Sequence, residues 1–275
     1  MLGEDRKIYG TGGGAYKHES LFKSELKAEI IKIDEMKSIQ CGLLYILDNV
    51  KDAIFSYDNS YKYFQGGTEE LLPFLIVNVG SGVSMIKVST GFGYERVFGT
   101  MIGGGTLMGL SNMLLGIDDF ETLLKLSEKG DNSKIDMMVK DLYGDSANKY
   151  GLEANLISCS FGKVAASVAV RRSKSFENPS EVTIDQPDKF EDEDMAKALV
   201  MMIAGNVAHL AALCARIHKI KRVMFTGNYI KNSPINMTEI TEALKIWSNG
   251  DMECLFLKYD GYLGCIGCIV ESFKT

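Results

Sequence analysis

Residues 74–84 read Phe74-Leu75-Ile76-Val77-Asn78-Val79-Gly80-Ser81-Gly82-Val83-Ser84, an apolar run that ends in a glycine turn. Such a run is typical of a buried strand followed by a tight turn. Residues 83–89 and 94–98 are predicted as the next two strands of a meander. Strand-like and helix-like segments are mixed along the rest of the chain. The pattern predicts an α/β fold with a mixed sheet.

Further elements are predicted from apolar spacing on either side of this run. Short strands are expected at residues 7–9, 30–33, 222–225 and 254–257. Helical spacing predicts helices at residues 36–50, 120–126, 135–142, 198–214 and 266–273. Residues 51–72 and 171–191 are expected to be loops. Asn236 and Glu239 have the spacing of a capping box ahead of one more helix.

The composition narrows the class of protein. The chain has 275 residues, 46% of them hydrophobic and 24% charged, which is ordinary for a soluble globular protein of one large domain or two lobes. Lys and Arg number 30 against 36 Asp and Glu, a net charge of -6. A basic field for polyanions is therefore not expected, and nucleic acid is a poor partner.

Two features bear on compartment and membrane. No signal-like apolar segment opens the sequence, so the scattered cysteines predict reduced thiols in a cytoplasmic protein. Cys265 and Cys268 form a C-x-x-C pair, for which buried packing residues are favoured over redox or metal chemistry.

Residues 198–214 are nearly all apolar, but Asn206 and His209 interrupt them. A buried core helix is therefore predicted, with no membrane span; His209 is expected to be a core or helix-contact residue.

Three glycine clusters follow or precede predicted elements of the sheet. They are Gly80-Ser81-Gly82 with Ser84, Gly103-Gly104-Gly105-Thr106, and Gly227-Asn228. Glycines let backbone N–H groups approach phosphate oxygens, and amides at a helix N-terminus favour anions. One such cluster alone is more often a tight turn. Three in one α/β chain favour a nucleotide site, although both common phosphate-loop motifs are missing.

Longer motifs resemble the eukaryotic-type pantothenate kinases. The resemblance is carried by Val77–Ser84, Tyr94-Glu95-Arg96-Val97-x-Gly99-Thr100, Gly103–Thr106, Lys129-Gly130-Asp131, Ser160-Phe161-Gly162, Gly227-Asn228, Trp247-Ser248-x-Gly250, Thr11–Lys17 and Asp34-Glu35. These motifs occur in order over nearly the whole chain. The resemblance implies the actin-like ATPase fold, two ribonuclease H-like lobes around a nucleotide cleft, as in acetate kinase, sugar kinases, Hsp70 and actin.

The resemblance also implies a reaction and its partners. The family transfers a phosphoryl group from ATP, with Mg²⁺, to pantothenate, forming 4'-phosphopantothenate in the first step of coenzyme A biosynthesis. Acetyl-coenzyme A or another acyl-coenzyme A inhibits it by feedback. The family forms homodimers through its second lobe, so a homodimer is expected here. No residue of this chain is assigned as a metal ligand.

The catalytic roles follow from the same resemblance. Glu35 matches the family's catalytic base, and a carboxylate at a strand-to-helix junction can take a hydroxyl proton. The alternative is that Asp34 and Glu35 only cap the helix that follows. Arg96 matches the arginine that meets substrate and phosphate or acyl-coenzyme A; the alternative is a surface charge.

The binding roles are assigned in the same way. Ser81 and Ser84 match positions that contact the nucleotide or acetyl-coenzyme A; the alternative is that they only fill the turn and the strand. Trp247 resembles a family residue near the pantothenate and acyl pocket at the dimer interface. As the only tryptophan it is equally plausible as a core residue.

One departure from the family qualifies these expectations. The sequence contains no Asp-x-Gly-Gly-Thr phosphate loop, with which the family's first lobe begins. Residues 1–72 are therefore predicted to be the remainder of the N-terminal lobe, with residues 73–275 as the ribonuclease H-like C-terminal lobe. The alternative function is a catalytically deficient relative that senses acyl-coenzyme A or supports a partner subunit. An insertion near residues 173–190 has no functional interpretation.

Overall fold

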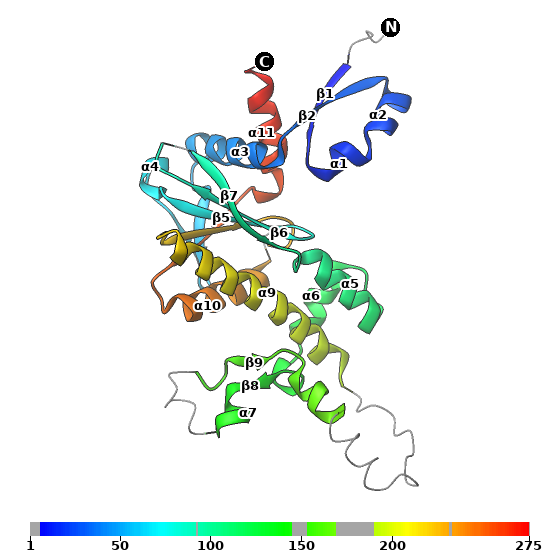
Figure 1. Cartoon of the computed structure of the whole chain (residues 1–275), viewed down its shortest axis with the longest axis vertical. Coiled ribbons are helices and arrows are strands. Elements are labelled where there is room, and N and C mark those ends of the chain that lie inside the picture. Colours follow the sequence, from blue (N-terminus) through cyan, green and yellow to red (C-terminus); the bar gives the residue numbers. More distant parts are fainter. Residues whose placement is uncertain (1–5, 92, 145–152, 169–189, 231–232, 275) are drawn as a thin grey trace. The chain divides into compact units, whose positions relative to one another are not determined.

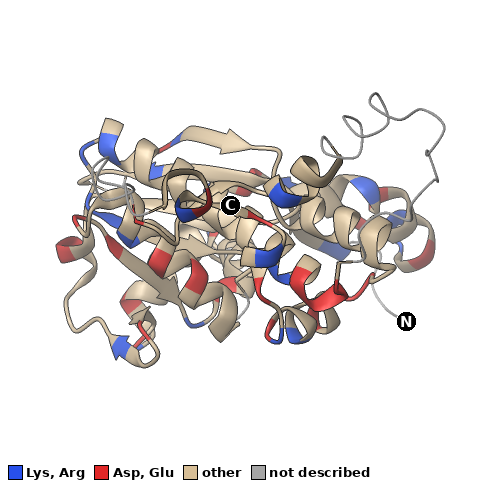
Figure 2. Ribbon diagram, turned by 90° about the horizontal axis from the view of Figure 1, so that it is seen from below, with Lys and Arg blue, Asp and Glu red and all other residues tan. Residues whose placement is uncertain are grey.

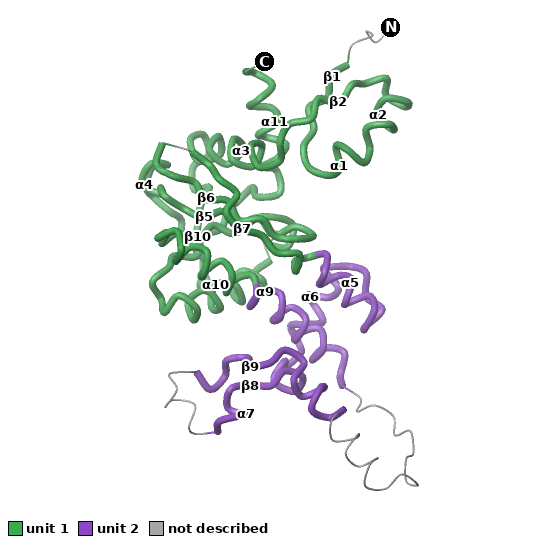
Figure 3. Tube along the Cα trace, viewed as in Figure 1, with its two compact units in different colours: residues 1–104, 207–275 green, residues 105–206 purple. Residues whose placement is uncertain are grey.

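The computed structural model describes residues 6–91, 93–144, 153–168, 190–230 and 233–274 (Figure 1). Contacts divide the chain into two compact units, Met1–Gly104 with Val207–Thr275, and Gly105–Asn206 (Figure 3). The lobe boundary between residues 72 and 73 stays a prediction. Most of the loop expected at residues 171–191, and most of the insertion near residues 173–190, lies outside the described residues.

The first unit contains a seven-stranded sheet of order β4-β3-β11-β10-β5-β6-β7. Its strands are β3 (Ile54–Tyr57), β4 (Tyr61–Tyr63), β5 (Phe74–Val79), β6 (Val83–Val88), β7 (Tyr94–Thr100), β10 (Arg222–Thr226) and β11 (Glu253–Leu257). Strands β5, β6 and β7 form an antiparallel meander, whereas β10 lies parallel to β5 and β11 parallel to β10. A meander extended by two parallel strands beside its first strand is the ribonuclease H-like order. The predicted α/β fold with a mixed sheet is confirmed.

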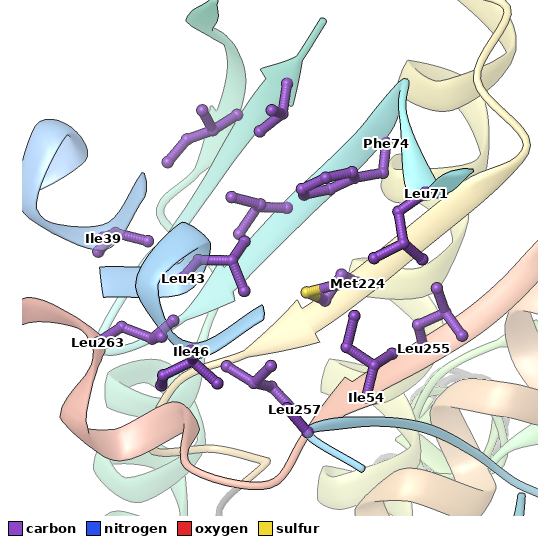
Figure 4. Close-up of a cluster of buried hydrophobic side chains, with 14 residues drawn as sticks. Ile39, Leu43, Ile46, Ile54, Leu71, Phe74, Met224, Leu255, Leu257 and Leu263 are labelled. Atoms are coloured by element: carbon purple, nitrogen blue, oxygen red, sulfur yellow. The ribbon is translucent and has the colours of Figure 1, made fainter. Parts of the chain in front are cut away.

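Helix α3 (Glu35–Asn49) covers one face of this sheet and forms the core with it. Ile39, Leu43 and Ile46 recur at helical spacing and pack with Phe74 and Ile76, which share one face of β5 (Figure 4). Leu43 is fully buried, so Leu43→Ala removes about 2–5 kcal/mol from the free energy of unfolding.

Helix α11 (Leu263–Ser272), which follows the short helix η4 (Asp260–Tyr262), packs tightly on α3. A side chain at Gly267 would collide with the backbone of Ser38, and one at Gly42 would collide with that of Leu263. The two glycines therefore allow the helix backbones to approach closely.

A smaller sheet lies in the same unit. Strands β1 (Arg6–Thr11) and β2 (Ala28–Ile33) are parallel and are joined by helices α1 (Gly12–Lys17) and α2 (Glu19–Leu26). Thr11 pairs with Ile33, and its Oγ1 donates a hydrogen bond to the Ile33 carbonyl at 2.9 Å. Both strands thus end at one edge, where the segments that follow them meet.

The second unit contains α5 (Gly104–Leu115) from its second residue on, and α6 (Phe120–Ser127). These helices are followed by η1 (Asn132–Lys134), β8 (Met137–Met138), α7 (Val139–Tyr143) and β9 (Ile157–Cys159). The helix predicted at residues 135–142 is wrong in its first part. The buried Asp136 carboxylate accepts hydrogen bonds from Asn132 Nδ2 and Phe161 N, both at 2.8 Å. These bonds hold the segment before β8 out of a helix, and β8 pairs with β9.

The long helix α9 (Asp192–Ile217) confirms the helix predicted at residues 198–214. Its length and hydropathy would allow it to cross a membrane, but 61% of its most apolar window is buried inside the protein. The absence of a membrane span stays a prediction. Segments with Lys and Arg (blue) and segments with Asp and Glu (red) are interspersed along the ribbon (Figure 2).

Two local predictions are wrong. The loop expected at residues 51–72 contains β3, β4 and α4 (Thr68–Leu71), because Ile54 and Phe55 are buried and pair with β11. The capping box at Asn236 does not form, since α10 (Pro234–Ser248) begins earlier. Ser233 is its N-cap, and proline suits the first helical position.

Candidate functional site

The candidate site lies where the parallel strands β5 and β10 end side by side. Thr226 of β10 pairs with Asn78 of β5, and a glycine turn follows β5. In that turn Gly80 N donates to the Gly82 carbonyl at 2.9 Å, and Gly104 N donates to the Gly80 carbonyl at 2.8 Å. The second glycine cluster is therefore joined to the first.

The backbones of these two clusters approach too closely for side chains. A Cβ atom on Gly103 would lie 2.8 Å from the Ser81 carbonyl oxygen, and one on Gly104 would lie 2.9 Å from that of Gly80. A side chain at Gly103 or Gly104 would therefore force the backbone of the neighbouring turn to move. Gly105 and Thr106 continue the cluster into the first turn of α5.

The third cluster meets the same strand end. Gly227 has φ +102°, and a Cβ atom there would lie 2.5 Å from the Val79 carbonyl oxygen, to which Tyr229 N donates at 3.2 Å. Asn228 is exposed beside it, whereas Tyr229 is buried and burial raises the pKa of its hydroxyl. Five glycines thus lie together at the carboxyl ends of parallel strands, where α/β sheets bind ligands. They are Gly80, Gly82, Gly103, Gly104 and Gly227.

The side chain of Arg96 lies on the same face of the sheet as Ser84 because of a β-bulge in β7. Ser84 pairs with Gly99, but Ile86 pairs with Arg96, so Val97 is an extra residue in β7. Without it, Arg96 would face Lys87 and point to the other face of the sheet. Arg96 Nε instead donates to Ser84 Oγ at 3.5 Å.

The guanidinium of Arg96 lies over the backbone of Gly99. A Cβ atom on Gly99 would collide with Arg96 Nη2. Arg96 is exposed, Ser84 is half-buried, and Ser81 is exposed at the tip of the turn. The structure therefore brings Ser84 and Arg96 together, with Ser81 beside the glycine clusters.

Glu35 lies at the ends of the other parallel pair, β1 and β2. The N-cap of α3 is Asp34, whose Oδ1 accepts from Lys37 N at 2.9 Å. Glu35 is the first helical residue, and its carboxylate lies 3.6 Å from the position of a Cβ atom on Gly12. The capping role thus belongs to Asp34, and the Glu35 side chain is exposed.

Gly12 is a feature that the sequence reasoning did not assign to the site. Its φ of +70° is a conformation that favours glycine, and it follows β1 directly. The sequence contains a pattern that could have identified it, since the predicted strand at residues 7–9 is followed by Gly12, Gly13 and Gly14, as the other strands are followed by glycines. The parallel register of β1 and β2 is what brings this turn to Glu35.

Trp247 lies on α10, and its ring stacks on that of His209 of α9. Its ring is 3.6 Å from that of His209, at an interplanar angle of 6°, and Arg216 Nη2 donates to its carbonyl at 2.9 Å. Partial burial lowers the pKa of His209. The helix-contact prediction for His209 is confirmed, and the pocket role of Trp247 stays a prediction.

The cysteine pair differs from expectation in one member. Cys268 is buried, with its Sγ 3.7 Å from Ser38 Oγ, but Cys265 is exposed on the same helix. The prediction of two buried packing residues is therefore wrong for Cys265. Over the described ranges, no three His, Cys, Asp or Glu side chains gather in a way that could hold a metal ion.

Comparisons with known proteins cover almost the whole chain. The family model described as Fumble matches residues 2–271. The chain is 37% identical over 272 residues to mouse 4'-phosphopantetheine phosphatase, covering 98% of this chain and 31% of that protein. It is 39% identical over 266 residues to Arabidopsis thaliana pantothenate kinase 2 (96% and 28% covered) and 38% identical over 269 residues to pantothenate kinase 1 of that plant (96% and 66% covered). The chain thus spans about a third to two thirds of the length of these relatives.

Solved structures give weaker matches. Balamuthia mandrillaris glucokinase in complex with glucose has a TM-score of 0.42 at 12% identity, covering 88% of this chain and 65% of that one. A ROK family glucokinase from Streptomyces griseus has a TM-score of 0.41 at 9% identity, with 94% and 72% covered.

Proposed function

Since the chain belongs to the Fumble family of pantothenate kinase-type proteins, we propose that it phosphorylates pantothenate with ATP. The product would be 4'-phosphopantothenate, formed in the first step of coenzyme A biosynthesis. The single observation that carries the proposal is the meeting of three glycine clusters at the ends of β5 and β10, where Ser84 binds Arg96 of the neighbouring strand β7. Two relatives named pantothenate kinase support it. Because the chain spans only part of their length, the activity of the whole protein belongs to the proposal.

The glycine clusters fit ATP. Gly103, Gly104 and Gly227 let the backbones at these strand ends approach one another closely, and glycine-rich turns of this kind can present backbone N–H groups to phosphate oxygens. Ser81 and Ser84 add hydroxyl groups beside these turns. We assign the phosphates of the nucleotide to the turns at Gly80–Gly82, Gly103-Gly104 and Gly227, the glycine cradle; the assignment of Gly105, Thr106 and Asn228 to the nucleotide rests on the family resemblance.

Mg²⁺ fits the reaction as part of the nucleotide complex. When bound, it neutralises charge on the phosphate oxygens during transfer. The described residues offer no cluster of metal ligands, and magnesium commonly keeps waters and phosphate oxygens as ligands. The chain's own residues therefore act on the nucleotide and on the acceptor.

Glu35 is assigned as the general base. Asp34 caps α3, so the Glu35 carboxylate is available to accept the proton of the pantothenate primary hydroxyl. Gly12 leaves space beside this carboxylate. The proton would rest on a Glu35 Oε atom while the hydroxyl oxygen attacks the γ-phosphorus of ATP, whose bond to the bridging oxygen breaks to release ADP.

Arg96 is assigned to the charge that develops on the phosphoryl group. Its Nη groups are not used by the bond to Ser84, and paired guanidinium donors match phosphoryl oxygens. An acyl-coenzyme A carries an adenine nucleotide and a pyrophosphate as ATP does. We therefore include feedback inhibition by acetyl-coenzyme A or another acyl-coenzyme A at this same cradle.

The proposal extends to assembly and location. We propose a cytoplasmic homodimer in which α9 and Trp247 contribute to the subunit interface. On α9, Leu213 is 40% and Ile217 is 77% exposed, and the two lie one helical turn apart, so they form an apolar surface that a subunit interface would cover.

The test is Glu35→Gln, assayed with pantothenate and MgATP. Loss of a general base lowers turnover about a hundredfold or more, while ATP affinity stays as in the wild type. Glu69→Gln, an equivalent change at an exposed position of α4, serves as the control and keeps full activity. A collapse of ATP affinity together with turnover would make Glu35 structural and contradict its role.

A catalytically deficient relative is the second candidate. The observation in its favour is that one relative at 37% identity, mouse 4'-phosphopantetheine phosphatase, is named for an activity other than pantothenate kinase. Such a protein would bind acetyl-coenzyme A, or support a partner subunit, without forming 4'-phosphopantothenate. Acetyl-coenzyme A binding without any product in the wild-type assay would favour it.

A further inference from the structure

We propose that Asn78 is a further ligand-binding residue of the nucleotide site, and this inference rests on the proposed function. Its side-chain amide would donate a hydrogen bond to a phosphoryl oxygen. It would be the first of three donors in a row, followed by Ser84 and Arg96, on the neighbouring strands β5, β6 and β7.

The position of Asn78 in the sheet is the first argument. Phe74, Ile76 and Asn78 alternate along β5 and share one face. The two apolar residues are fully buried in the core, but Asn78 is partly exposed and lies two residues before Gly80. The amide oxygen of Asn78 accepts from the buried Thr226 hydroxyl, which explains a polar residue here, and the amide NH2 group is then left for a ligand at the partly exposed strand end.

The contacts of Asn78 orient its amide. Thr226 Oγ1 donates to Asn78 Oδ1 at 3.4 Å, and Thr226 is fully buried. A Cβ atom on Gly227 would lie 2.8 Å from the same oxygen, so β10 and the turn after it enclose this side of the amide. The Nδ2 group therefore points away from β10, toward β6, where Ser84 is the register partner of Asn78.

Ser84 and Arg96 continue the pattern. Ser84 Oγ accepts from Arg96 Nε, so the hydroxyl hydrogen of Ser84 remains to donate. Arg96 keeps its two Nη groups. The acceptor oxygens of Asn78 and Ser84 already accept from Thr226 and Arg96, so these two side chains present donor groups to a ligand. A row of donors of this kind favours an anionic ligand.

The length of the row indicates a polyphosphate. Neighbouring strands lie about 4.8 Å apart, so the row from β5 to β7 spans about 10 Å. That distance suits several linked phosphoryl groups better than one carboxylate. The neutral amide also matters, because an aspartate at position 78 would place a negative charge against the phosphates.

The test is calorimetric titration of the whole chain with MgATP, tripolyphosphate and adenosine. Hydrogen bonds to charged groups contribute about tenfold or more in affinity. Asn78→Ala should weaken MgATP and tripolyphosphate by about that factor, Asn78→Asp should weaken both further, and adenosine should be unaffected. Asn59→Asp makes the same chemical change at the exposed turn between β3 and β4 and should change nothing.

A second variant covers the case in which changes at Asn78 impair folding. Thr226→Val keeps Asn78 but removes the hydroxyl that orients its amide, and should weaken tripolyphosphate severalfold. Wild-type affinity for MgATP and tripolyphosphate in these variants would overturn the inference, as would a wild type that binds neither. Weakened binding together with a wild type that makes no 4'-phosphopantothenate would support Asn78 and refute the proposed kinase reaction.

Discussion

Gly227 offers the most direct test of how the site is built. We expect Gly227→Ala to destabilise the protein and to weaken MgATP binding together. The residue has φ +102°, which an alanine adopts only under strain of about 1–3 kcal/mol. Its new Cβ atom would also lie 2.5 Å from the Val79 carbonyl oxygen, a backbone atom that cannot rotate away.

The overlap forces the turn after β10 to move. Movement breaks or lengthens the bond from Tyr229 N to the Val79 carbonyl, now 3.2 Å, which contributes about 0.5–1.5 kcal/mol. Together the strain and the lost bond lower the free energy of unfolding by about 1.5–4.5 kcal/mol. The same movement separates Asn228 from the turn at Gly80, so nucleotide affinity falls as well.

Gly250→Ala is the matched control. Gly250 has φ +77°, but nothing lies within 4 Å of a Cβ atom there. This variant should lose only the conformational term of about 1–2 kcal/mol, with unchanged MgATP affinity. Urea unfolding and calorimetric titration measure both quantities. Equal losses of stability in the two variants, with wild-type affinity in Gly227→Ala, would refute the close approach of the two strand ends.

Three further predictions follow from the same geometry. Arg96→Ala should weaken acetyl-coenzyme A binding by about 1.5–3 kcal/mol in calorimetric titration, and equal affinity would place Arg96 outside the ligand site. Hydrogen bonds from Lys274 and Lys37 lower the pKa of Glu271 from 4.5 to about 2. The stability that they add is present above pH 4.5 and is lost as the pH falls toward 2, so Glu271→Gln should flatten this acid limb in urea unfolding. Sedimentation at micromolar concentration should show a dimer, and a monomer with α9 intact would contradict the proposed interface.

Much of the fold could be predicted from local sequence. Residues 74–79 are apolar without interruption and end in glycine, so the strand and its turn needed no tertiary information. The meeting of Gly80 and Gly227 was also predictable in kind, since the carboxyl ends of parallel strands share an edge. Residues 51–72 were not predictable in this way. Their strands are short and polar in part, and only pairing with β11 stabilises them.

The role of Glu35 shows where local reasoning stops. Asp34 and Glu35 are adjacent carboxylates at a helix start, and either could cap the helix. The structure separates them, because the Asp34 side chain turns back to Lys37 N while Glu35 lies toward Gly12. That distinction depends on the parallel register of β1 and β2, which is a contact between residues far apart in the sequence.

The placement of Arg96 depends on an even less visible feature. Strict alternation in a regular hairpin would pair Arg96 with Lys87 and direct it to the face opposite Ser84. One extra residue, Val97, reverses this, and nothing in its chemistry announces a bulge. Glycine at position 99 also suits this arrangement, because a Cβ atom there would lie 2.8 Å from the Val83 carbonyl oxygen and would displace the guanidinium. The donor row at the nucleotide site therefore exists because an irregularity in β7 turns Arg96 onto the face that Asn78 and Ser84 already share.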